Sequence, residues 1–272
     1  MKQMLPALAL ALTATFSVSA AQADDAALHA AVTGSQRTPA NVQRDGARHP
    51  EATLAFFGLK PTQTVIELIP GGGWYTEILA PYLHDKGQLI EAGNDPDGDS
   101  EGARRGAARF KAKLDAKPEV YGHVKLGVFD TDAGKFDLGK PGSADMVLTF
   151  RNIHNWVDLG DDKTRAAFKA IFAVLKPGGV LGVEEHRLPA AMQQQDRAPT
   201  GYLHETYVIK MAESMGFKLA ARSEINANPK DKADHPNGVW ALPPTFANKD
   251  ANRAEYEAIG ESDRMTLKFV KP

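Results

Sequence analysis

The sequence has no cysteine among its 272 residues. This absence excludes disulfide bonds, zinc sites built from thiolates and cysteine nucleophiles, so any catalysis must use other side chains. It also suits an oxidising compartment, in which stray thiols are a liability. Excess charge is lacking as well, because the formal net charge at pH 7 is −2. Such a balance gives no sign of a surface that binds nucleic acid.

Long apolar stretches are absent too, except near the N-terminus. There Lys2 precedes an apolar run from Leu5 to Val18, and Ala21-Gln22-Ala23 follows it. The run is shorter than the roughly 20 residues that cross a bilayer, and the small residues suit signal peptidase. No cysteine follows the run, which excludes a lipoprotein anchor. We therefore expect a signal peptide over residues 1–23, a mature chain that begins at Asp24, and a periplasmic or secreted protein without a stable membrane anchor.

Without the signal peptide about 250 residues remain, enough for one α/β domain with a full core. Residues 24–49 are polar and contain Gly34, Pro39 and Gly46. They are expected to form a loosely structured lead-in with one short helix at most, which is a possible lid. Residues 50–272 are expected to form the folded domain.

Short apolar segments alternate with helical patterns along residues 50–272. The segments expected to be strands are residues 64–69, 88–92, 124–129, 144–150, 180–183, 217–222 and 265–270. Because right-handed crossovers place helices over both faces of a parallel sheet, this alternation predicts an α/β protein with a mostly parallel seven-stranded sheet. Residues 226–245 are rich in Gly, Pro and Asn and are expected to be an inserted loop.

Polar residues gather where the expected strands end. In parallel sheets ligands bind beyond the carboxyl ends of the strands, so these residues should converge on one cleft. They are Glu67 and Gly71 to Gly73 after the first strand, Asn94 and Asp95 after the second, Arg151 to Trp156 after the fourth, and Glu184 to His186 after the fifth. Their convergence is the main reason to expect a functional site.

The turn after the first strand resembles a known motif. Residues 65–73 read Val-Ile-Glu-Leu-Ile-Pro-Gly-Gly-Gly. This segment resembles the nucleotide-loop motif of class I S-adenosylmethionine (SAM)-dependent methyltransferases, which usually reads acidic-x-Gly-x-Gly-x-Gly. Glu67 matches the acidic position, and Gly71 and Gly73 match the second and third glycines. Ile69 stands where the motif has its first glycine.

Further segments extend the resemblance. Residues 175–181 resemble the family's turn into its fifth strand, and residues 265–270 resemble its last strand. The resemblance covers roughly residues 50–272 and implies a Rossmann-like methyltransferase fold with SAM as the cofactor. More narrowly, the chain resembles a bacterial branch of exported, predicted methyltransferases whose substrate is unassigned. The segments that carry this narrower resemblance are residues 48–50, 71–76 and 150–156.

The resemblance implies cofactor contacts for several polar residues. Without a Cβ, Gly71, Gly72 and Gly73 let the backbone pass close to the amino-acid and ribose portions of SAM. Glu67 is expected to accept a hydrogen bond from the cofactor's ammonium group or from the loop amides. The same residues are also compatible with a structural βα turn and a structural carboxylate at a strand end.

Other cofactor contacts are expected at less specific positions. Asn94 and Asp95 follow Gly93, which aligns with the carboxylate that usually holds the ribose diol in this family. Asp130, at the end of the third strand, is a candidate for contact with the adenine amino group, or an exposed turn aspartate. The Trp74 ring is a candidate for a cation–π contact with the sulfonium.

The fourth-strand tail is expected to act on the methyl acceptor. Methyl transfer is an in-line displacement, so the protein must position the acceptor and, where needed, remove its proton. His154 is the preferred base because imidazole titrates near neutral pH, although a structural histidine has the same appearance. Asn152 and Asn155 are expected to orient the acceptor, and Arg151 to hold a carboxylate or phosphate on it. The tail lacks the Asp/Asn-Pro-Pro-aromatic signature of many amino-group methyltransferases, so nucleobase and glutamine acceptors are not expected.

Three functions remain open from the sequence. The first is a SAM-dependent methyltransferase that acts on a small molecule or an envelope component, although SAM is made in the cytoplasm. The second is a non-catalytic ligand-binding protein with a drifted methyltransferase fold, which Ile69 and the missing second-strand carboxylate favour. The third is a metal-dependent hydrolase that would use His154, Glu185, His186 and His204. These four residues are scattered along the chain, so no metal is expected. The oligomeric state is left open.

Overall fold

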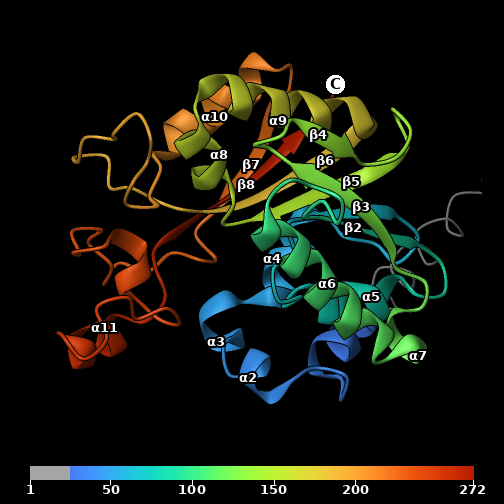
Figure 1. Ribbon diagram of the computed structural model, residues 1–272, viewed down its shortest axis with the longest axis horizontal. Coiled ribbons are helices and arrows are strands. Elements are labelled where there is room, and N and C mark those ends of the chain that lie inside the picture. The colour runs from blue at the N-terminus through green and yellow to red at the C-terminus, as the bar shows by residue number, and fades with distance from the viewer. Residues whose placement is uncertain (1–24) are drawn as a thin grey trace, which may run out of the picture.

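The computed structural model describes residues 25–272, so the predicted signal peptide at residues 1–23 lies outside the described range. A single eight-stranded sheet runs through the described residues (Figure 1). Its strands are β1 (Thr64–Leu68), β2 (Gln88–Gly93), β3 (Lys125–Asp130), β4 (Lys135–Asp137), β5 (Ala144–Phe150), β6 (Leu175–His186), β7 (Lys218–Ser223) and β8 (Arg264–Val270). Their order across the sheet is β4-β3-β2-β1-β5-β6-β8-β7.

The centre of the sheet is parallel. Strand β1 pairs in parallel with β2 and β5, β2 with β3, and β5 with β6. Strand β8 runs antiparallel between β6 and β7, and β4 runs antiparallel to β3. The predicted α/β class with a mostly parallel sheet is confirmed, but the predicted number of seven strands is wrong. The additional strand β4 has 3 residues, too few to show the two-residue alternation by which strands are recognised in a sequence.

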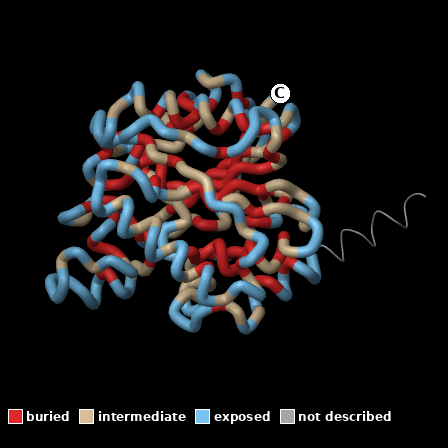
Figure 2. The backbone as a smooth tube through the Cα atoms, turned by 45° about the vertical axis from the view of Figure 1, so that its right-hand side comes forward, coloured by how far each residue is buried: buried red, intermediate tan, exposed pale blue. Residues whose placement is uncertain are grey.

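Helices cover both faces of the sheet, as predicted (Figure 1). On one face, α8 (Ile153–Leu159), α9 (Asp161–Val174) and α10 (Glu205–Ser214) pack with the strands in one hydrophobic cluster. On the other face, α4 (Pro50–Phe57), α5 (Thr76–Leu83), α6 (Glu101–Asp115) and α7 (Pro118–Tyr121) contribute to a second cluster. Figure 2 shows buried residues concentrated in the interior of the molecule and exposed residues around its outside.

A long excursion separates β7 from β8. Residues 226–245, predicted to be a loop, contain turns and the short 3-10 helix η1 (Gly238–Ala241). The helix α11 (Arg253–Ile259) follows before β8 begins. Among residues 25–272, no helix is both long and apolar enough to span a membrane.

The segment before α4 is more helical than predicted. It contains a helix over residues 25–33, followed by α2 (Pro39–Val42) and α3 (Asp45–Arg48). The expectation of one short helix at most is wrong because Leu28, Ala31 and Val32 share one helix face and pack into the second hydrophobic cluster.

Candidate active site

Two cavities open at the carboxyl ends of the parallel strands. The first has a volume of about 1030 Å³ and lies between α6 and strands β2 and β3. The second has a volume of about 420 Å³ and lies over the ends of β1, β5 and β6. The turn of residues 69–72, which follows β1, lines both cavities. The strand ends therefore converge as the sheet topology requires, and this turn is the wall that the two cavities share.

The shared turn leaves open space beside its backbone. A methyl group added to Gly71 or Gly72 would meet no atom within 4 Å. Gly71 has a φ of +59°, a conformation that favours glycine. Ile69 has a φ of +49°, so the residue that replaces the motif's first glycine adopts a glycine-like backbone despite its branched side chain. Such a conformation costs on the order of 1–3 kcal/mol, which indicates that the surrounding structure holds this turn firmly.

Glu67 on β1 and Glu91 on β2 form a pair of buried acids. Glu67 lines the second cavity and Glu91 the first. Thr76 donates a hydrogen bond to Glu67 Oε2 at 3.1 Å, and the carboxyl groups of Glu67 and Glu91 lie within hydrogen-bond reach of each other. Burial raises the pKa of Glu67 to about 7. Burial and the neighbouring Glu67 charge raise the pKa of Glu91 well above its usual value. The pair therefore holds at least one proton near neutral pH.

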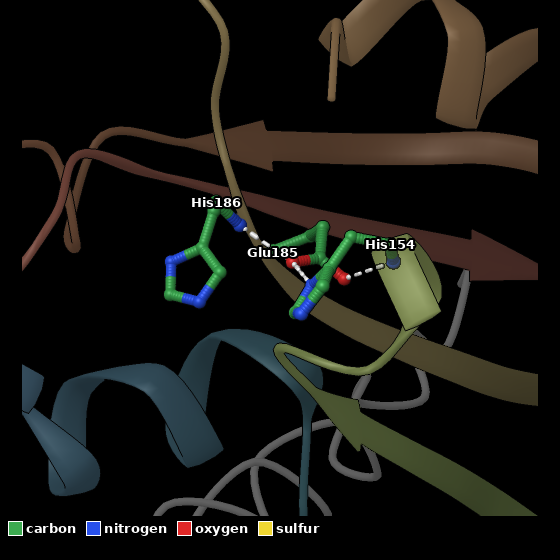
Figure 3. Close-up of side chains that lie close together, drawn as sticks. All are labelled: His154, Glu185 and His186. Atoms are coloured by element: carbon green, nitrogen blue, oxygen red, sulfur yellow. Dashed lines mark hydrogen bonds and ion pairs between the residues drawn. The ribbon is translucent and has the colours of Figure 1, made fainter. Parts of the chain in front are cut away.

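His154, in the first turn of α8, is held by Glu185 at the end of β6 (Figure 3). Its Nδ1 lies 2.9 Å from Glu185 Oε1. Glu185 also accepts hydrogen bonds from the backbone N–H groups of Ile153, His154 and His186, at 2.6, 3.2 and 2.8 Å. Because the carboxylate is an acceptor, Nδ1 carries the proton of the neutral imidazole. The Nε2 lone pair is then free to take a proton in the second cavity, which His154 lines.

His186 lies beside His154 in the same cavity, with ring centroids 5.3 Å apart. Its Nδ1 is 2.6 Å from Ser262 Oγ. Burial, His154 and Arg151 together lower the pKa of His186 well below its usual value, so the imidazole is neutral. The cavity thus contains two adjacent imidazoles, each fixed by a hydrogen bond to Nδ1.

The structure brings together three of the four residues named in the metal hypothesis. Ligand atoms of His154, Glu185 and His186 lie within 4.8 Å of one another. His204 does not join them, because its Nε2 bonds the Met192 carbonyl oxygen at 2.9 Å. The donor types suit a transition metal, but Glu185 is already saturated with hydrogen bonds and arginines line the same cavity. The positive charge of these arginines opposes the binding of a cation in the same cavity.

Arg151 and Asn152, both predicted to contact the acceptor, line the second cavity. Arg151 Nη1 donates to Glu184 Oε1 at 2.6 Å, and the Tyr75 hydroxyl donates to the other oxygen of that carboxylate at 3.2 Å. Asn152 Nδ2 donates to the Leu68 carbonyl oxygen at 3.0 Å. Asn152 therefore ties the ends of β5 and β1 together, and Arg151 remains partly available to a ligand. Asn155 also lines the cavity.

Of the three residues predicted to contact the ribose or the adenine, only one lines a cavity. Asn94 lines the first cavity. Asp95 and Asp130 line neither cavity. Asp95 pairs with Lys135 Nζ at 2.6 Å, and Asp130 accepts a hydrogen bond from the Ala133 N–H at 2.8 Å. Both carboxylates thus stabilise the hairpin region around β3 and β4.

Trp74, predicted to face a sulfonium, is buried and lines the second cavity. Its Nε1 donates to the Asn41 carbonyl oxygen at 2.9 Å. The guanidinium carbons of Arg37 and Arg48 each lie 4.9 Å from the ring centroid. The cation–π partners of this ring within the described chain are therefore two arginines.

Several residues that line the cavities are missing from the sequence prediction. Arg44 and Arg48 come from the segment before α4, and Trp240 comes from η1. No local signal marks them, because only tertiary packing carries these segments to the strand ends. Glu91 did carry a signal, since it is a carboxylate between the apolar residues Ile90 and Ala92 of an expected strand.

Comparison with known proteins gives matches among solved structures only. No protein-family model matches the sequence, and no curated protein matches it significantly. A SAM-dependent methyltransferase from Aquifex aeolicus matches with a TM-score of 0.56 and 14% identity, over 84% of this chain and 93% of that one. The [4+2]-cyclase SpnF matches with a TM-score of 0.57 and 16% identity, over 93% and 95%.

A third similar structure contains the product of methyl donation. The glycopeptide N-methyltransferase MtfA, complexed with S-adenosylhomocysteine (SAH), matches with a TM-score of 0.52 and 16% identity, over 84% of this chain and 90% of that one. Identities this low establish the fold and not the reaction, and the cyclase illustrates that the same fold serves other chemistry. The chain therefore has the Rossmann-like fold shared by SAM-dependent methyltransferases.

Proposed function

We propose that the protein is a SAM-dependent methyltransferase whose first cavity holds the cofactor and whose second cavity holds the acceptor. The observation that carries this proposal is the turn of residues 69–72, which forms a wall of both cavities. Group transfer between two bound molecules needs two binding spaces that meet, because the reacting atoms must come within about 3–3.5 Å. This turn is where the two spaces meet.

The first cavity fits SAM in size and chemistry. Its volume of about 1030 Å³ is at the upper end of the range of ligand pockets, about 300–1,000 Å³, and leaves room for SAM. Phe110, Leu126 and Val128 give apolar surface for an adenine ring. Glu91 lines this cavity, and its carboxyl oxygens suit the hydroxyl groups of a ribose. When bound there, SAM supplies a methyl group on a positively charged sulfur.

His154 is the proposed general base. His154 Nε2 would take the proton that the acceptor loses when it receives the methyl group of SAM bound in the first cavity. Glu185, 2.9 Å from Nδ1, fixes the ring and stabilises the imidazolium that forms. The products are the methylated acceptor and SAH.

Residues 25–49 are proposed to cover the acceptor cavity. Asn41, Arg44 and Arg48 of this segment line that cavity. Arg44 Nε pairs with Glu261 Oε1 at 2.7 Å, which fastens the segment across the strand ends. A cover of this kind excludes water from the transfer step.

Binding of SAM and SAH tests the proposed function. Isothermal titration calorimetry on the purified protein should show binding of both molecules. Gly72→Val should abolish it, because the new side chain enters open cavity space without a strained φ. Gly46→Val is the matched control, since a methyl group there also meets no atom within 4 Å and residue 46 lines neither cavity. Equal, weak heats for all three proteins would remove the cofactor assignment.

Export to the periplasm or medium is also proposed. It rests on Lys2, the apolar run and the small residues that end at Ala23. Mass spectrometry of the protein from the periplasmic fraction should find a chain that begins at Asp24. Full-length chain confined to the cytoplasm would contradict export.

A further inference from the structure

One end of the second cavity has more guanidinium groups than carboxylates. Arg44, Arg48 and Arg151 line this end. Arg264, on β8, lies directly behind it and is buried. The carboxylates that pair with these four arginines belong to Glu184 and Glu261.

A single carboxylate serves three of these arginines. Glu261 pairs with Arg44 Nε at 2.7 Å, with Arg48 Nε at 3.0 Å and with Arg264 Nη1 at 3.0 Å. A carboxylate has two oxygens and cannot balance three unit charges. The Nη2 nitrogen of Arg44 is buried and has no hydrogen-bond partner among the described residues. An unpaired buried N–H of a charged group is costly, so this end of the cavity lacks an acceptor.

The pKa directions of Arg48 and Glu261 agree with a surplus of positive charge. Burial would also lower the pKa of Arg151, but Glu184 and its other negative neighbours outweigh burial and raise it. Burial and the neighbouring Arg151 lower the pKa of Arg48 to about 9, although Glu261 opposes the change. Burial alone would raise the pKa of Glu261, but Arg48, Arg264 and Arg44 outweigh it and lower that pKa to about 2. The carboxylate is therefore already ionised at neutral pH and can supply no further negative charge.

The nearby carboxylates Glu185 and Glu67 do not remove this surplus. Glu185 accepts hydrogen bonds from the His154 imidazole and from three backbone N–H groups, and it forms no ion pair with an arginine of the described chain. Glu67 faces Glu91 on the neighbouring strand, and burial raises its pKa to about 7. Among residues 25–272, no carboxylate beyond the two already named as their partners forms an ion pair with these four arginines, so an anionic ligand would supply the missing negative charge.

Another part of the lining of this cavity is apolar. Val239, Trp240, Pro243 and Pro244, all from the excursion between β7 and β8, line it. The Trp240 ring lies 5.9 Å from the His154 ring, and the side chain is partly exposed at 36%. An exposed tryptophan beside the proposed base provides a surface on which a flat or apolar group can pack.

We propose that the methyl acceptor is a small organic anion. Arg44 and Arg48, with Arg151 beside them, bind its acidic group, and Trp240 and the adjacent prolines contact its apolar body. This arrangement brings a hydroxyl or amino group of the same molecule to His154. The inference rests on the proposed function, because it names the acceptor class for that same site.

The carboxylate of the cofactor is a second possible source of the anion, and the experiment separates the two. Calorimetry on the purified protein measures benzoate, 4-hydroxybenzoate, inorganic phosphate and phenol, each with and without SAH. SAH itself and 5′-methylthioadenosine, which lacks the carboxylate, are titrated separately. At least one anion should bind about ten-fold or more tightly than neutral phenol.

Two variants locate the anion. Arg44→Gln should weaken anion binding about ten-fold and leave SAH binding unchanged, while Trp240→Ala should weaken benzoate and leave phosphate unchanged. Arg222→Gln is the control, since this arginine is 64% exposed and pairs with Glu205 away from the cavity. Melting temperatures establish that each variant is folded.

Two results would overturn the proposal. One is phenol binding as tightly as every anion. The other is Arg44→Gln weakening SAH but neither 5′-methylthioadenosine nor the anions, which would assign the arginines to the cofactor. Failure of SAH to bind the unaltered protein would instead remove the proposed function, and the titrations without SAH would still test the anion site.

Discussion

Glu67 and Glu91 occupy paired positions on the neighbouring strands β1 and β2, and both carboxyl groups are buried. Two acids this close cannot both ionise cheaply, since each charge raises the pKa of the other and burial penalises both. The pair lies beneath the turn of residues 69–72, where the two cavities meet. Its protonation therefore affects the stability of the part of the fold that forms the site.

Raising the pH is expected to destabilise the protein through this pair. The pKa of Glu67 is about 7 in the folded chain against an ordinary 4.5. The contribution of Glu67 to the free energy of unfolding is complete below pH 4.5 and is lost as the pH rises through 7. The resulting fall in the free energy of unfolding is on the order of 3 kcal/mol. Chemical denaturation at pH 5 and pH 8 should show a smaller difference for Glu67→Gln/Glu91→Gln than for the unaltered protein. The surface variant Glu101→Gln should behave like the unaltered protein, and identical pH slopes in all three would contradict this account.

Glu261 is expected to stabilise the protein in the opposite pH range. Arginines lower its pKa to about 2 from 4.5, so its contribution is present above pH 4.5 and disappears as the pH falls towards 2. Glu261→Gln should therefore lower the free energy of unfolding at pH 7 by about 3 kcal/mol, and by far less near pH 2. Denaturant titrations at both pH values measure this. Glu257→Gln removes an exposed carboxylate on α11, and a comparable loss in that control would show that the effect is not specific.

Loss of the proposed base should reduce transfer without affecting cofactor binding. His154→Gln removes the Nε2 acceptor, so the rate of methyl transfer to any acceptor of the protein should fall by roughly 10²–10⁴-fold. SAH affinity, measured by calorimetry, should stay the same because His154 lines only the second cavity. His29→Gln serves as the comparison, because this histidine is exposed and lines neither cavity. A His154→Gln protein that retains full activity would exclude the histidine as base.

Metal removal is expected to have no effect on stability. The donor atoms of His154, Glu185 and His186 are close together, but the Glu185 oxygens are occupied and Arg151 raises the local positive potential. Treatment with EDTA, or addition of Zn²⁺, should shift the melting temperature by less than about 1 °C. For a chain of this size about 1 kcal/mol corresponds to a shift of roughly 2–4 °C. A rise of several degrees with Zn²⁺, lost in His186→Ala, would re-establish the metal hypothesis.

The elements of the fold were predictable where local patterns are strong. The segments that became β1 and β5 were recognised because buried parallel strands leave mostly apolar runs. The strand β4 and the helix over residues 25–33 were missed for different reasons. The first is too short for any periodicity, and the second has a narrow apolar stripe of Leu28, Ala31 and Val32 in a polar context.

The residues of the candidate site were likewise predicted correctly in some positions and not in others. The glycine turn and His154 directly follow strands, so the rule that ligands bind at strand ends was enough to select them. Asp95 and Asp130 were selected by the same rule, but the hairpin of β3 and β4 engages both carboxylates. Whether a strand-end side chain points to a cavity or back to its neighbours depends on contacts that the local sequence does not specify.

Residues a few positions apart are enough to predict the alternation of strands and helices, the glycine turn after β1 and the histidine after β5, because each of these features is local. The tertiary structure alone decided that Arg48 meets Glu261, 213 positions away, and that Glu67 lies opposite Glu91. Such pairs form only when strand order and register are fixed. The charge of the second cavity was therefore visible in the folded chain and not in the linear one.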